Sequence, residues 1–133
     1  MTFELWILFA ATLLGLVHIA AASFTFKAQV GNAYTVGPRD EARAPTGVAG
    51  RLDRALRNFL ETFPLFAVLV LLVHVSGRAG AASQWGAALY LGGRVLFLPL
   101  YALGVPWLRT FSWNLATLGL VGVGAQLLLA AAR

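Results

Sequence analysis

The chain contains no cysteine and a single methionine, and only 11% of its 133 residues are charged. The absence of cysteine excludes disulfide bonds and a cysteine nucleophile, so any thiol chemistry has to be supplied by a substrate. A charged fraction this low is also well below that of an ordinary soluble domain, where about a quarter of the residues carry charge. The low charged fraction indicates a membrane protein.

Apolar residues make up 59% of the chain and gather into long runs. A helix needs about 20 apolar residues to cross the hydrocarbon core of a membrane. Four stretches approach or reach that length, and they cover residues 3–26, 59–76, 85–103 and 111–132. The sequence therefore predicts an all-α integral membrane protein, with residues 1–133 forming one four-helix domain and residues 28–50 forming a glycine- and proline-rich loop.

The basic residues lie mostly on one side of the predicted spans. The first and third connections with their flanks carry Lys27, Arg39, Arg43, Arg51, Arg54, Arg57 and Arg109, whereas the other side has Arg78 and Arg133. By the positive-inside rule, the first and third connections are expected in the cytoplasm and both termini outside. This bias accounts for most of the net charge of +5, so nucleic acid is not an expected partner.

Three polar residues share one helical face at the mouth of the second span. Arg54, Asn58 and Glu61 follow one another at spacings of four and three residues, which brings their side chains to the same side of a helix. Charged groups that enter a membrane helix are costly unless they pair or bind something polar. A cation, an amide and an anion in this arrangement indicate a binding site for a polar ligand.

Arg94 lies near the middle of the third span, and Tyr101 follows seven residues later on the same face. A mid-span arginine needs an anion, and two possibilities stay open from charge alone. One is a structural ion pair with Glu61, and the other is a bound ligand. His18 and His74 lie on different spans without further ligands beside them, so no metal site is expected.

Two separated runs in this sequence resemble motifs of the MAPEG family, the membrane-associated proteins of eicosanoid and glutathione metabolism. Residues 54–66, RALRNFLETFPLF, are similar to the second-helix signature of that family. Residues 94–109, RVLFLPLYALGVPWLR, resemble the third helix and following turn of its bacterial members, and GPRDE at 37–41 resembles their first loop. The resemblance spans the four-helix plan and suggests a multi-pass protein of a bacterial inner membrane.

The resemblance implies a homotrimer that holds glutathione at each subunit interface near the cytoplasmic face. Arg54 and Arg94 would hold the carboxylates of glutathione, Asn58 its peptide backbone and Glu61 its ammonium group. Tyr101 would supply a hydroxyl contact. Arg109 would stabilise the glutathione thiolate, because a nearby cation lowers the pKa of a thiol from about 8.5.

The leading hypothesis is a glutathione-dependent membrane enzyme that conjugates glutathione to lipophilic electrophiles, reduces lipid hydroperoxides, or does both. Glutathione would be its co-substrate, and the hydrophobic substrate would arrive from the bilayer. A second hypothesis is a non-catalytic protein of the same fold that binds a lipid or a partner protein. A third is a small transporter, which would normally place a coupling carboxylate deeper in the membrane than Glu61.

Overall fold

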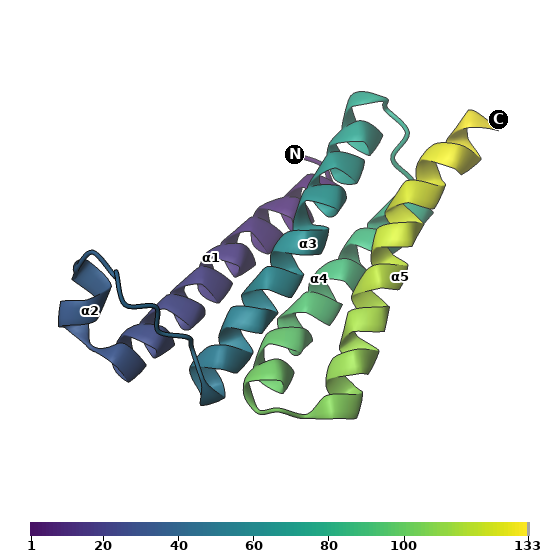
Figure 1. The fold of residues 1–133 in the computed structure, drawn as a ribbon. Helices are drawn as coiled ribbons and strands as arrows, with labels where there is room; N and C mark the ends of the chain where they lie inside the picture. The colour runs from purple at the N-terminus through teal and green to yellow at the C-terminus, as the bar shows by residue number, and fades with distance from the viewer. Residues whose placement is uncertain (133) are drawn as a thin grey trace.

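The computed structural model describes residues 1–132 and consists there of helices joined by short connections (Figure 1). The helices are α1 (Phe3–Val30), α2 (Asn32–Val36), α3 (Gly47–Val75), α4 (Ala81–Ala102) and α5 (Pro106–Ala131). The prediction of an all-α bundle is confirmed. Arg133, which entered the topology prediction, lies outside the described residues.

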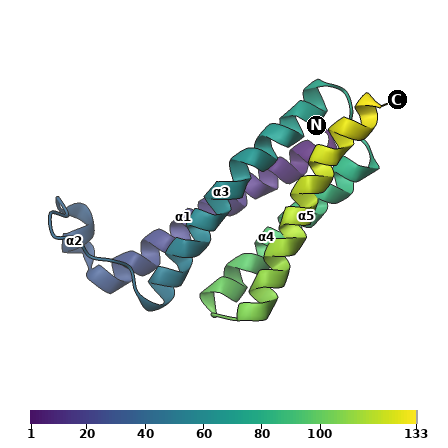
Figure 2. The ribbon, with the colours of Figure 1, turned by 45° about the vertical axis from the view of Figure 1, so that its right-hand side comes forward.

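The four long helices run up and down beside one another, and the two termini lie at the same end of the bundle (Figure 1). We call this the terminal end, and we call the opposite end, which holds α2 and the turn between α4 and α5, the loop end. The closest packing is between α4 and α5, followed by that between α1 and α3. Figure 2 shows these two pairs from the side.

Three of the long helices, α1, α3 and α5, are long and apolar enough to cross a membrane. The fourth, α4, covers residues 85–102 of the expected third span, 85–103, and has 22 residues, which is also a spanning length. Its apolar character is lower because it contains Arg94 and Gln84 among several small residues. The structure therefore agrees with a membrane bundle in which α4 carries the polar interior.

The connection between the first two long helices is shorter and more ordered than the predicted loop at 28–50. Helix α1 continues to Val30 and α3 already begins at Gly47. Gln29 bridges the loop, because its Nε2 donates to Ala44 O at 3.1 Å and its Oε1 accepts from Thr46 N at 2.9 Å. These bonds fix the loop and its short helix α2 against the end of α1.

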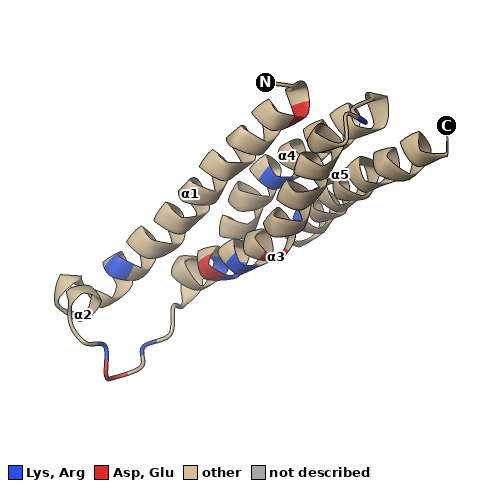
Figure 3. Ribbon diagram, turned by 90° about the horizontal axis from the view of Figure 1, so that it is seen from above, with Lys and Arg blue, Asp and Glu red and all other residues tan. Residues whose placement is uncertain are grey.

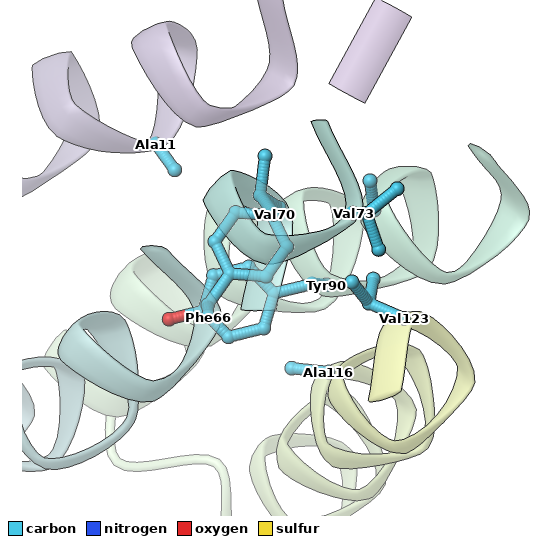
Figure 4. Packing of buried hydrophobic residues seen from close by; sticks show 8 residues of the cluster. Ala11, Phe66, Val70, Val73, Tyr90, Ala116 and Val123 are labelled. Carbon is cyan, nitrogen blue, oxygen red and sulfur yellow. The ribbon is translucent and has the colours of Figure 1, made fainter. Parts of the chain in front are cut away.

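The core is built from small and aromatic side chains at the centre of the bundle. Phe66 of α3 stacks on Tyr90 of α4 with ring centroids 3.9 Å apart, as Figure 4 shows. Gly86 and Gly93 of α4 and Gly119 of α5 face the neighbouring helix so closely that an added Cβ would collide with its backbone. Glycine at these positions is what lets α4 and α5 approach each other.

Candidate functional site

A cavity of about 220 Å³ opens between three helices in the half of the bundle nearer the loop end. Asn58 of α3, Phe97 and Tyr101 of α4, and Arg109, Thr110 and Trp113 of α5 line this cavity. Three of the predicted site residues, Asn58, Tyr101 and Arg109, therefore meet at one place. Tyr101 and Arg109 are eight residues apart and are brought together by the tight turn that joins α4 to α5, whereas Asn58 comes from α3, more than 40 residues earlier in the chain.

Arg109 and Tyr101 form one wall of the cavity. The guanidinium carbon of Arg109 lies 4.6 Å from the centroid of the Tyr101 ring, in a cation–π contact. Tyr101 packs edge-on against Phe97, with ring centroids 5.2 Å apart. Arg109 therefore has a fixed, half-buried position, and its positive charge faces the cavity that it lines.

Arg94 is fully buried, and its guanidinium bonds to two residues of α3. Its Nη1 donates to Asn58 Oδ1 and its Nη2 to Thr62 Oγ1, both at 2.6 Å. Its Nε has no hydrogen-bond partner among the described residues. Since Asn58 accepts from Arg94 through Oδ1, its amide nitrogen is left to donate to a group in the cavity.

Glu61 forms no ion pair with Arg94 within residues 1–132, so one of the two possibilities left open by the sequence, the structural ion pair, is not present there. The side-chain ion pairs within residues 1–132 are Arg43 with Glu41 and Arg57 with Asp53. The two Nη atoms of Arg94 donate instead to a neutral amide and a hydroxyl, while its Nε has no partner among the described residues.

Arg54 and Glu61 lie on the exposed side of α3, about one turn before and after Asn58. Neither lines the cavity of Asn58 and Arg109. Figure 3 shows that charged residues gather on the loop and on the neighbouring part of α3. The single chain therefore presents Arg54 and Glu61 outward, beside the cavity and not inside it.

Several polar contacts were not predicted from the sequence. Thr62, four residues after Asn58, bonds to Arg94 and lies 3.1 Å from the Tyr90 hydroxyl. The spacing of four residues is the signal that could have revealed it. At the terminal end, Glu4 is buried and its Oε1 accepts from Ser83 Oγ at 2.6 Å, a long-range pairing that no local pattern reveals.

The fold and this cavity define a class of protein, a helical membrane bundle with a buried arginine and a cationic, aromatic-lined cavity near one end. Within that class the chain is placed by its sequence. It matches the MAPEG family over residues 4–129, nearly its whole length, and it belongs to that family. No curated protein sequence matches the chain at a significant level. The chain is thus a membrane protein of the family associated with glutathione and eicosanoid metabolism.

Proposed function

We propose that the protein is a glutathione-dependent membrane enzyme that conjugates glutathione to lipophilic electrophiles, reduces lipid hydroperoxides, or does both. The observation that carries the proposal is the convergence of Asn58, Tyr101 and Arg109 on one cavity. An amide donor, a phenol and a cation suit a ligand that carries carbonyl, carboxylate and thiolate groups. Family membership agrees with this class of ligand.

The cavity of a single chain has suitable residues for part of a glutathione molecule, but not for all of it. The cavity, at about 220 Å³, is smaller than the roughly 300 Å³ at which ligand sites usually begin. Arg54 and Glu61, which we propose hold a carboxylate and the ammonium group, lie outside it on the exposed face of α3. A site that includes them requires a further wall.

We propose that this wall comes from a second copy of the chain in a homotrimer. The exposed side of α3 carries residues at alternating spacings of three and four, the pattern of a helix–helix seam. Its members are Glu61, Leu65, Val68, Leu72 and Val75. Packing of such faces from several copies would cover the apolar residues and enclose Arg54 and Glu61 beside the cavity.

Arg109 is the residue to which we assign activation of the thiol. A cation beside the bound thiol stabilises the thiolate, which is the nucleophile. In conjugation by substitution the thiolate sulfur forms a bond to an electrophilic carbon, and the electron pair of the bond that breaks departs with the leaving group. In conjugation by addition the electron pair of the multiple bond moves to a neighbouring atom, which takes up a proton. In peroxide reduction the thiolate sulfur attacks one oxygen of the lipid hydroperoxide, the O–O bond breaks, and the lipid alkoxide leaves and is protonated to the alcohol. The glutathione sulfenic acid then reacts with a second glutathione to give the disulfide and water.

Arg94 is assigned an indirect contribution. It holds Asn58 Oδ1 at 2.6 Å and thereby orients the amide that lines the cavity. We also propose that the loop end faces the cytoplasm, where glutathione is present, because the basic residues gather at that end (Figure 3). The lipophilic substrate would then enter sideways from the bilayer.

The test of the activity is the pH dependence of turnover with an electrophile panel and with a lipid hydroperoxide. Replacing Arg109 by Ala removes the cation, so the pKa of the bound thiol rises and activity at neutral pH falls. Activity should recover as the pH is raised through the thiol pKa, about 8.5 in water. Turnover by Arg109→Ala equal to that of the wild type at neutral pH would contradict the assignment. Glutathione binding without turnover would favour the non-catalytic hypothesis.

A further inference from the structure

Two further cavities lie at the loop end between α1, the loop and α3. They share no lining residue with the cavity of Asn58 and Arg109. The two cavities measure about 290 and 200 Å³. They adjoin one another, because Ser23, Phe26 and Arg39 line both. We call this pair the loop slot.

The loop slot has cations at its rim and apolar side chains along its wall. Lys27 and Arg43 join Arg39 among its lining residues, and Phe26 and Leu56 supply apolar surface. The combination of positive charge and apolar wall fits an amphiphile with an anionic head.

Two of these cations have no acidic partner in the part of the chain that the structure describes. The Nε and Nη2 of Arg39 donate to the backbone carbonyl of Thr35 at 3.2 and 2.8 Å, which leaves its charge uncompensated. Lys27 forms no ion pair within residues 1–132. Asp53, the acidic residue that lines the slot, is bound to Arg57 at 2.7 Å, so its charge is largely offset.

The position of Arg39 is built into the loop. Its backbone has a φ of 58°, in the left-handed region that side chains other than glycine rarely adopt. The Tyr34 hydroxyl, which donates to Glu41 O at 2.8 Å and accepts from Arg43 N at 3.1 Å, ties the loop together on either side of Arg39. The loop therefore holds the guanidinium in place before any ligand arrives.

The length of α1 indicates how deep the slot lies in the membrane. Helix α1 has 28 residues, which corresponds to a length of about 42 Å, whereas the hydrocarbon core is about 30 Å thick. The helix is therefore longer than the core is thick, and the charged Lys27 in its last turn indicates that the excess lies at the loop end, near the lipid headgroups. The Phe24 side chain is 68% exposed at the slot and offers apolar surface toward the acyl chains.

We propose that the loop slot binds an anionic phospholipid of the adjoining leaflet, with the headgroup phosphate between Lys27 and Arg39 and the start of an acyl chain along Phe24 and Phe26. Guanidinium and ammonium groups are both strong phosphate donors. This site is separate from the proposed glutathione site and stands independently of it. Its occupation would tie the loop and α1 to the membrane surface.

The experiment uses the full chain purified in detergent and titrated with phosphatidylglycerol or phosphatidylcholine, with bound lipids counted by native mass spectrometry. We expect retention of phosphatidylglycerol at lower lipid concentration than phosphatidylcholine. Each of Lys27→Gln and Arg39→Gln should weaken phosphatidylglycerol binding about fivefold, the effect expected of one cation near an anionic headgroup. Arg78→Gln, a matched loss of one cation at the terminal end, should leave it unchanged.

Three outcomes would overturn the proposal. They are equal retention of both lipids, an equal loss in Arg78→Gln, and no loss in Lys27→Gln. The Lys27 variant is decisive even if Arg39→Gln disturbs the loop, because Lys27 makes no side-chain hydrogen bond within the described residues and its side chain is exposed. Excess inorganic phosphate distinguishes a phospholipid site from a site for free phosphate. At a phospholipid site the bound lipid should stay in place, because its acyl chain also contributes to binding, whereas at a site for free phosphate the added phosphate should displace the lipid.

Discussion

The close contact between α4 and α5 sets the spacing between Tyr101 and Arg109, and replacing Gly93 by Ala tests it. A Cβ at Gly93 would lie 2.6 Å from Ser112 O and 2.7 Å from Ala116 N. Both are backbone atoms of α5, so the two helices have to separate to admit the methyl group. The change should therefore both destabilise the bundle and widen the cavity.

The neighbouring Gly92 provides the matched control, because a Cβ there has nothing within 4 Å. Overpacking costs up to about 3 kcal/mol, and exchanging Gly for Ala in a helix returns about 1 kcal/mol. We expect Gly93→Ala to lower the free energy of unfolding by about 2 kcal/mol and Gly92→Ala to raise it by about 1 kcal/mol.

The assay is unfolding in mixed micelles, followed by circular dichroism as the fraction of denaturing detergent rises. The two alanine variants differ by one position on the same helix, so a difference between them of about 3 kcal/mol reports the contact and not the residue type. Glutathione binding should fall in Gly93→Ala and persist in Gly92→Ala. Equal stability of the two variants would refute the packing argument.

Thr62→Val removes one hydrogen bond to the buried guanidinium of Arg94 and should lower the free energy of unfolding by about 1.5–3 kcal/mol. The control Thr12→Val, at an exposed position of α1, should lower it by well under 1 kcal/mol in the same assay. Equal effects would contradict the assigned hydrogen bond. Tyr101→Phe keeps the ring under Arg109 but loses the hydroxyl, so we expect glutathione affinity to fall roughly tenfold with the pH profile of turnover unchanged. Tyr101→Leu also removes the ring and should shift that profile. A wild-type affinity in Tyr101→Phe would exclude the hydroxyl as a ligand contact.

The sequence predicted the helical architecture well because the apolar runs are long and bounded by charge or proline. It did less well at the helix ends. Residues 28–50 read as a loop because they contain glycine, proline and mixed charges, yet α3 begins at Gly47 and carries Arg51 and Arg54 in its first turns. The Nε of Arg51 donates to Ala102 O at 2.8 Å, a tertiary contact that supports this early start and that no local pattern indicates.

The sequence predicted which residues belong to the candidate site better than it predicted which of them contact one another. Asn58, Tyr101 and Arg109 share a cavity, because the four-helix plan places them in the halves of α3, α4 and α5 that are nearer the loop end. The partner of Arg94 depended instead on how α3 is rotated. Successive residues differ by roughly 100° around a helix, so turning Asn58 and Thr62 toward α4 leaves Glu61 on the exposed side.

The most direct test of the central claim is calorimetric titration of glutathione into the purified protein in nanodiscs, comparing wild type with Asn58→Ala and Asn114→Ala. Asn58 lines the cavity, whereas Asn114 is exposed on α5, so the pair matches one amide in the proposed site with one outside it. We predict saturable binding for wild type and Asn114→Ala, weakened at least about tenfold in Asn58→Ala. Absence of binding to the wild type, or equal affinity of the two variants, would contradict the claim that this cavity is the glutathione site.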